Sequence, residues 1–423
     1  MLLVRRIVRL RAALLGTVLS KRVNMADDSL QESLRDHLAW WGLRHFTSDR
    51  EYFAWQKQHF SADDLNQLAL HIERKRSGDR RDEIAFYDLA AQSRIYRVLY
   101  SQRYEYYEEI GWRTTAHFRH ANDVLDFGCG IGVMTTFYAG LFPEKNFVGV
   151  DRSSASIVVA QERADELGLR NLRFECVDAE TEQLSGSYDL VVATHVLVQA
   201  EQDLGLPSQN WRTFERERNL SQQLSFEQRT GLGIRLDGLC QVLNSSGVMI
   251  VSEKTRQLAR RVPFQRALAN RGLQPAERPA PFRYRTVEEV VEDGPFYVLS
   301  RGGTATLTWE EGPEQDQEQL FDPDAVSTSP ADVNVPLYEN HWPSAQSAWE
   351  QLNSRKLEKE VTLERAEGRQ WHVERGSSQE FEYLYCATTF DRRQLVIVER
   401  ARKGMLDAYY QEIVDDMSKE GDF

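Results

Sequence analysis

A glycine-rich turn near the middle of the chain has the spacing of a ligand-binding loop: Asp126-Phe127-Gly128-Cys129-Gly130-Ile131-Gly132. It follows an apolar run and precedes residues 133–141, whose apolar positions have helical spacing. Glycines allow backbone N–H groups at a helix start to approach a polar ligand closely. A dinucleotide site would require G-x-G-x-x-G, but counting from Gly128 places Val133 where the third glycine belongs. The pattern that fits is D-x-G-x-G-x-G.

Polar residues also end the apolar runs that follow this turn. Asp151 comes nineteen residues after Gly132, where a carboxylate can accept both hydroxyls of a ribose. Asp178 ends the third run, and Thr194 with His195 follows the fourth. An imidazole of near-neutral pKa can take a proton from an oxygen or nitrogen nucleophile, so His195 is the candidate catalytic base. Taken singly, each of these residues has an ordinary structural role as a cap, turn or packing residue.

In this order, the motifs resemble those of class I S-adenosylmethionine-dependent methyltransferases, a Rossmann-like family, over residues 123–253. The resemblance implies S-adenosylmethionine as the cofactor, with Asp151 on its ribose and Asp178 beside Ala179 on its adenine. The family's Leu-x-Pro-Gly-Gly turn is replaced by Asn244, Ser245 and Ser246. No metal is expected. The cofactor-binding residues implied in this way are Asp126, Gly128, Cys129, Gly130, Gly132, Asp151, Arg152, Asp178, Ala179 and Thr194.

Three hypotheses remain for what the protein does with the cofactor. The first is an O, N or C nucleophile of a small molecule, favoured because residues 194–197 lack the family's Asn-Pro-Pro-aromatic mark of exocyclic amino-group methylation. The second is RNA or protein, recognised by the C-terminal region and by a nearly unopposed basic segment. The third is a non-catalytic, cofactor-binding assembly or regulatory partner. The basic segment contains Lys254, Arg256, Arg260, Arg261, Arg266, Arg271, Arg278, Arg283 and Arg285.

Strands that alternate with helices are expected to position these residues. Short apolar runs alternate with amphipathic stretches between residues 123 and 301, which predicts a parallel α/β sheet covered on both faces. The resemblance implies a Rossmann-like, doubly wound, mostly parallel sheet of seven strands. We expect a targeting-like or disordered tail, a helical N-terminal region, the cofactor domain, an acidic linker and a small α+β C-terminal domain, at residues 1–24, 25–120, 121–303, 304–335 and 336–423.

Further segments are candidates for the substrate side. The tyrosine-rich stretch 100–107 precedes the first strand and is expected either to cover the site or simply to pack. The long connection 200–235 is a candidate insertion over the site. His341 and His372, beside tryptophans, are weaker candidates for a substrate surface.

Composition limits the class of protein. With 65 acidic and 52 basic residues, the net charge of −13 disfavours non-specific binding to nucleic acid. No apolar run approaches the roughly 18 residues of a membrane-spanning helix. The four cysteines form no C-x-x-C pair, which indicates a reducing compartment. We therefore expect a cytoplasmic protein, or a mitochondrial one if the basic, acid-free residues 1–24 act as a presequence.

Overall fold

The structure is a computed structural model that describes residues 29–76, 78–199, 202–302, 307–314, 316, 320–322, 335–379 and 381–419. The expected tail at 1–24 and much of the expected acidic linker at 304–335 lie outside the described residues. Within the described ranges, no helix has both the length and the apolar character needed to cross a membrane.

The chain forms two compact units, which we describe separately. Unit 1 comprises Met1–Gln202, Arg229–Lys254 and Leu268–Thr308. Unit 2 comprises Asp203–Gln228, Thr255–Ala267 and Trp309–Phe423. The second unit is therefore built from three separate stretches of chain, two of which come from inside residues 121–303.

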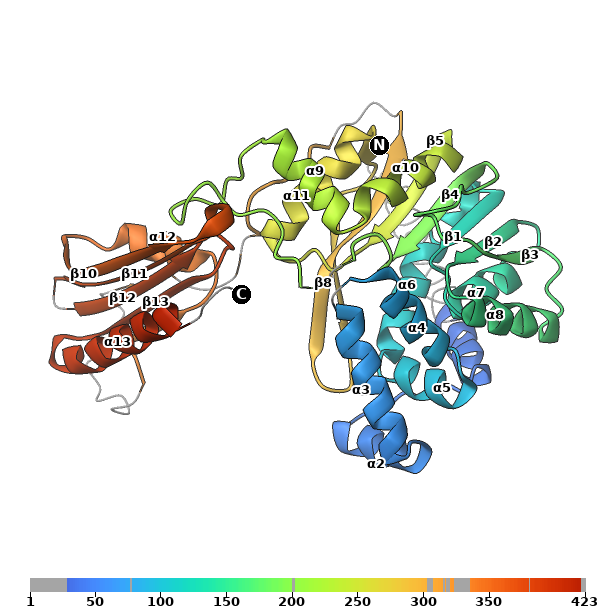
Figure 1. Cartoon of the computed structure of the whole chain (residues 1–423), viewed down its shortest axis with the longest axis horizontal. Helices are drawn as coiled ribbons and strands as arrows, with labels where there is room; N and C mark the ends of the chain where they lie inside the picture. The colour runs from blue at the N-terminus through green and yellow to red at the C-terminus, as the bar shows by residue number, and fades with distance from the viewer. Residues whose placement is uncertain are drawn as a thin grey trace, which may run out of the picture. The chain divides into compact units, whose positions relative to one another are not determined.

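An eight-stranded sheet forms the centre of unit 1, with the strand order β3-β2-β1-β4-β5-β8-β6 and β7 paired to β8 (Figure 1). Strands β1 to β5 are parallel, whereas β8 runs antiparallel to β5, β6 and β7. The mostly parallel α/β fold is as predicted, with eight strands rather than seven because residues 280–285 pair with β8. The strands are β1 (Asp123–Phe127), β2 (Asn146–Asp151), β3 (Leu172–Cys176), β4 (Tyr188–Thr194), β5 (Leu243–Ser252), β6 (Leu273–Pro275), β7 (Ala280–Arg285) and β8 (Val290–Arg301).

Helices α7 and α8 pack against β2, and α8 also packs against β3 (Figure 1). A helical region precedes the sheet, as predicted, and begins with a helix over residues 29–40. The start of α3 is a capping box, because Asp64 Oδ2 accepts from Ser61 N at 3.0 Å and Ser61 Oγ accepts from Asp64 N at 3.2 Å. The helices that carry unit 1 are α2 (Asp49–His59), α3 (Ala62–Arg76), α4 (Arg80–Ala90), α5 (Ser93–Ser101), α6 (Tyr104–Thr115), α7 (Val133–Leu141), α8 (Ser154–Glu166) and α10 (Leu232–Val242). Helices α9 (Leu220–Arg229) and α11 (Leu258–Asn270) each run across a boundary between the two units.

Unit 2 contains an antiparallel sheet of order β10-β11-β12-β13-β9, with α13 along one face (Figure 1). The sheet and the helices α12 and α13 agree with the α+β C-terminal domain that the sequence predicted. In β11, buried polar residues such as His372 and Arg375 interrupt the apolar pattern. The elements are β9 (Tyr338–Asn340), α12 (Ser344–Gln351), β10 (Arg355–Glu364), β11 (Gln370–Ser378), β12 (Phe381–Thr388), β13 (Arg393–Glu399) and α13 (Lys403–Lys419).

Buried polar contacts join the three stretches of unit 2. Arg216, which is almost wholly buried, forms an ion pair with Asp391. Asp391 Oδ2 also accepts from Ala259 N at 3.0 Å. Trp211 stacks on His372 with ring centroids 3.5 Å apart. Residues 203–228, the greater part of the connection 200–235 that was a candidate insertion over the site, are thus a structural part of unit 2.

Candidate functional site

The polar residues selected from the sequence gather at one edge of the sheet in unit 1. Strands β3, β2, β1 and β4 are adjacent and parallel, so their carboxyl ends meet at the same edge. Residues 126–132, 151–152, 178–179 and 194–195 lie at or just beyond these ends. In open α/β sheets this edge is where ligands bind.

The glycine loop connects β1 to α7 with a backbone that requires glycine. Gly128 and Gly132 have φ of 77° and 82°, in the left-handed region. A Cβ on Gly128 would lie 2.4 Å from Val196 Cγ2, and a Cβ on Gly132 would lie 2.7 Å from Phe174 Cζ. Gly130 is different: the nearest atom to a Cβ there is the Tyr100 hydroxyl at 3.7 Å. The loop therefore packs tightly at both ends, and its middle residue keeps an open side.

Asp151, at the end of β2, braces this loop. Its Oδ2 accepts from Gly130 N at 2.9 Å and its Oδ1 accepts from Ser153 N at 2.8 Å. Burial raises the pKa of the Asp151 carboxyl above its ordinary value, while the backbone N–H groups oppose the increase. Each carboxylate oxygen can accept a second hydrogen bond, so this group has capacity for ribose hydroxyls.

The Asp126 side chain is buried, so it is placed to support the loop rather than to contact a ligand directly. Its Oδ2 accepts from Thr135 Oγ1 of α7 at 2.6 Å. Burial raises the pKa of Asp126 to about 6. Cys129 is held by the backbone as well, since its N donates to Val150 O at 3.0 Å. Both residues fix the loop relative to β1 and β2.

Helix α4 lies against the loops that follow β2 and β3, which the sequence did not indicate. Arg80 forms an ion pair with Asp178, the residue expected beside the adenine. Arg152 pairs with Glu83 of α4 and also with Glu180, at 3.4 Å. Ala179 lies half-buried in the same turn. The N-terminal helical region thus contributes charged partners to the cofactor edge.

The tyrosine-rich segment 100–107, which spans the end of α5 and the start of α6, also reaches this edge. Tyr100 and Tyr107 have ring centroids 5.8 Å apart, and Tyr106 stacks on His195 at 5.0 Å and 23°. Arg103 lies over the Tyr106 ring at 4.6 Å. This segment therefore contributes side chains to the site in addition to packing.

His195 follows Thr194 at the end of β4 and has a φ of 55°, an uncommon conformation for a residue with a side chain. Its Nδ1 accepts from Arg103 Nη2 at 2.9 Å, which leaves the ring proton on Nε2. Nε2 lies 3.0 Å from Asp293 Oδ2, without the alignment of a hydrogen bond. Burial lowers the pKa of His195 to about 4, helped by Arg103 and opposed by Asp293. The imidazole is therefore neutral at pH 7.

Asp293, from β8, is the partner that sequence reasoning missed. It accepts from the Tyr284 hydroxyl at 2.5 Å and is almost wholly buried. Burial alone would raise the pKa of Asp293, but His195, Tyr284 and Arg103 together hold it well below its ordinary value. The only local feature of the sequence that could have indicated Asp293 is that it is an acidic residue shortly before the apolar run of β8.

Glu253, also missed, fixes the backbone after His195. It accepts from Val196 N at 2.7 Å and from Leu197 N at 2.6 Å. Burial raises the pKa of Glu253 to about 7. The acid follows β5 directly, so a strand-end carboxylate was the available signal.

Residues 119–273 match the sequence model of a family described as a methyltransferase domain. This range contains the glycine loop, both strand-end aspartates and His195. The chain carries a class I S-adenosylmethionine-dependent methyltransferase domain.

Curated relatives match the methyltransferase domain over short stretches. A malonyl-(acyl-carrier protein) O-methyltransferase of Acetivibrio thermocellus is 34% identical over 71 residues, 17% of this chain and 24% of that protein. A tRNA (guanine-N(7)-)-methyltransferase of Rubrobacter xylanophilus is 46% identical over 54 residues, 13% of this chain and 24% of that protein. The chain thus spans about a quarter of the length of these relatives. Their names point to different acceptors, so the matches leave the acceptor open.

Solved structures resemble the chain at low identity. The N-methyltransferase NodS of Bradyrhizobium japonicum, in complex with S-adenosyl-L-homocysteine, is 13% identical. The alignment covers 48% of this chain and 88% of that one, with a TM-score of 0.33.

The basic segment that follows the methyltransferase β5 is not unopposed. Carboxylates pair with four of its arginines: Arg261 with Glu314, Arg266 with Glu311 at 2.6 Å, Arg271 with Asp237 at 2.7 Å, and Arg283 with Glu292 at 2.6 Å. Two of these acids come from the acidic stretch that was expected to be an exposed linker. Charge neutralisation of this kind weakens the attraction of a phosphate backbone.

Proposed function

We propose that this chain transfers a methyl group from S-adenosylmethionine to an O, N or C nucleophile of a small molecule. The observation that carries this proposal is the enclosed cluster around His195. The imidazole is walled by Tyr106 and lies within reach of Arg103 and Asp293, next to the turn whose Val196 packs on Gly128. A buried, aromatic-walled position with few polar groups suits a small acceptor.

The residues present fit the cofactor. The open side of Gly130 provides a place for close approach of the backbone, and Asp151 has lone pairs for two ribose hydroxyls. We assign the adenine side to Asp178 and Ala179, with Arg152 anchored beside them by Glu83. The supporting loop residues in this assignment are Asp126, Gly128, Cys129, Gly132 and Thr194.

S-adenosylmethionine, when bound, would supply a methyl group on a sulfonium centre: its S–CH3 bond would break as the acceptor nucleophile bonds to the methyl carbon, and the neutral thioether S-adenosylhomocysteine would leave. An acceptor hydroxyl or amine that replaces the Arg103 N–H at Nδ1 of His195 can pass its proton to this nitrogen. The negative charge of Asp293, 3.0 Å from Nε2, favours the tautomer with its proton on Nε2 and stabilises the imidazolium that forms. His195 is thus the proposed catalytic residue and Asp293 a positioning residue.

Calorimetric titration tests the cofactor assignment. S-adenosylmethionine and S-adenosylhomocysteine should bind with micromolar affinity, and a nicotinamide dinucleotide should not. Asp151→Asn should weaken binding by about 10- to 100-fold, because charge-assisted hydrogen bonds contribute roughly 1.5–3 kcal/mol. Asp165→Asn, at an exposed site on α8, is the matched control and should bind normally. Equal affinity in both variants would contradict the assignment.

Transfer of a tritiated methyl group tests the acceptor class. Small-molecule, RNA and protein fractions of a cell extract are offered separately, and label should enter the small-molecule fraction. His195→Gln should lower the transfer rate by about 100-fold or more without changing cofactor affinity. Label in RNA or protein would support the second reading of the acceptor, and cofactor binding with no transfer to any fraction would support the non-catalytic reading. We also propose a cytoplasmic location, which the four free cysteines support.

A further inference from the structure

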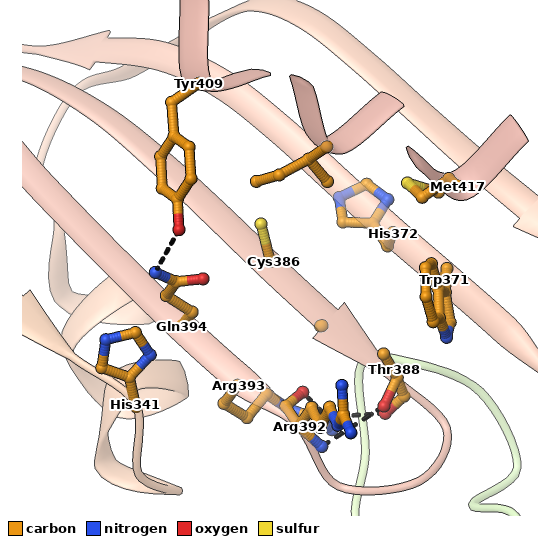
Figure 2. A pocket seen from close by; sticks show the side chains of 12 residues that line it. His341, Trp371, His372, Cys386, Thr388, Arg392, Arg393, Gln394, Tyr409 and Met417 are labelled. Atoms are coloured by element: carbon orange, nitrogen blue, oxygen red, sulfur yellow. Dashed lines mark hydrogen bonds between the residues drawn. The ribbon is translucent and has the colours of Figure 1, made fainter. Parts of the chain in front are cut away.

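A cavity lies in unit 2, between α13 and the sheet (Figure 2). Its volume is about 390 Å³, within the usual range for small-molecule sites. Side chains from strands β11, β12 and β13 and from α13 line it. All of its lining residues belong to unit 2, so it is distinct from the cofactor edge of unit 1.

Much of this cavity has apolar walls. Trp371 lies on one side, Ile413 and Met417 come from α13, and Cys386 lies on the sheet (Figure 2). Burial raises the pKa of Cys386 to about 12, so its thiol is uncharged at neutral pH. Such apolar walls favour a ligand with an aromatic or aliphatic group.

Several polar groups at the cavity, both buried and exposed, already have hydrogen-bond partners. Arg393 donates through Nε to Gln346 Oε1 at 2.8 Å and through Nη1 to Thr388 O at 2.7 Å. Gln394 Nε2 donates to the Tyr409 hydroxyl at 3.2 Å (Figure 2). These groups therefore shape the cavity and hold its walls in place.

Arg392 is the exception at the rim. Its backbone N donates to Thr388 Oγ1 at 3.3 Å, but among the described residues no carboxylate pairs with its guanidinium. No aspartate or glutamate lines the cavity in the described part of the chain. In the described part of the chain, Glu339 pairs with the lining residue His341 at 2.8 Å and Glu374 pairs with His372 at 3.1 Å, so the charge at the cavity that no carboxylate pairs is that of the arginines. This electrostatic pattern favours an anionic ligand over a neutral or cationic one.

We propose that this cavity binds a small apolar carboxylate, with its aromatic or aliphatic body against Trp371, Ile413 and Met417 and its anionic group at Arg392. The site is independent of methyl transfer, because no residue assigned to the cofactor or acceptor lines it. A guanidinium is well matched to a carboxylate, since it can donate two parallel hydrogen bonds.

Two fluorescent probes test the proposal on the full chain, with saturating S-adenosylhomocysteine present to fill the cofactor site. The anionic probe is 8-anilino-1-naphthalenesulfonate, and the neutral probe of similar shape is N-phenyl-1-naphthylamine. Arg392→Ala should weaken binding of the anionic probe about tenfold and leave binding of the neutral probe unchanged. Arg392→Lys should recover part of the lost affinity for the anionic probe. Lys356→Ala removes one positive charge from β10, away from the cavity, and should affect neither probe.

Filling the cavity provides a second, charge-independent test. Ile413→Trp adds bulk at a half-buried position on α13 and should weaken both probes at least tenfold, with normal circular dichroism. Decanoate and 3-phenylpropanoate should displace the anionic probe from the wild type, and the more effective competitor identifies an aliphatic or an aromatic ligand. Equal effects of Arg392→Ala and Lys356→Ala, or probe binding unchanged by Ile413→Trp, would overturn the proposal.

Discussion

Replacing Glu253 with glutamine should remove a pH-dependent loss of stability from unit 1. The Glu253 side chain is almost fully buried, and burial raises its pKa from 4.5 to about 7. The folded state therefore binds the proton more tightly than the unfolded state does. Stability is then highest below the unfolded pKa and falls as the pH rises towards 7, by about 3 kcal/mol in total at roughly 1.4 kcal/mol per pH unit. Glutamine can accept the same two backbone N–H groups through its amide oxygen without carrying a charge.

Hydrogen exchange read by mass spectrometry measures this effect in peptides from β4 and β5, separately from unit 2. Between about pH 4 and about pH 8, the wild type should lose about 3 kcal/mol of stability relative to Glu253→Gln, after correction for intrinsic exchange rates. Glu162→Gln, at an exposed position on α8, should follow the wild type. If the wild type and Glu253→Gln differ by the same amount at every pH, Glu253 is not protonated near neutral pH and the burial argument fails.

Three other substitutions have defined outcomes. Asp293→Asn should lower kcat about 10- to 100-fold with unchanged cofactor affinity, and Asp293→Glu should restore part of the lost kcat. If stopped-flow transfer assays give the same rate for the wild type and for Asp293→Asn, Asp293 does not position His195. Gly128→Ala should destabilise unit 1 by at least the 1–2 kcal/mol typical of a left-handed residue, and adding Val196→Ala should recover only the part due to the steric contact, as measured by urea unfolding. Arg216→Ala should cost about 3 kcal/mol by leaving the half-buried Asp391 without its cation, and calorimetry of the double alanine variant should show less than the sum of the two single losses.

The cofactor half of the site could be predicted from sequence because its signals are local. The loop around Gly130 follows a strand directly, Asp151 ends the next strand, and Asp178 comes two residues after the strand that follows it, so their order along the chain sets their place in a parallel sheet. The apolar runs in β1 to β5 were sufficient to locate these strands.

The acceptor half could not be predicted in the same way, because its contacts join distant segments. Arg103, His195 and Asp293 lie 92 or more residues apart and meet only in the folded unit. The pairing of Arg80 with Asp178 joins a helix to a strand end across 98 residues. No periodic pattern marks a charged residue whose partner is so remote, so Arg80, Arg103 and Asp293 resembled ordinary surface charges, whereas His195 was selected by its place after the fourth strand.

The discontinuous build of unit 2 has a consequence for synthesis on the ribosome. Arg216 and Asp391 are separated by 175 residues, and elongation proceeds at about 5–20 residues per second. The nascent segment around Trp211 therefore waits roughly 10–35 s for the strands that bury it. During that interval its tryptophan and arginine are a binding target for chaperones, and a chain that terminates before β12 would leave them exposed permanently.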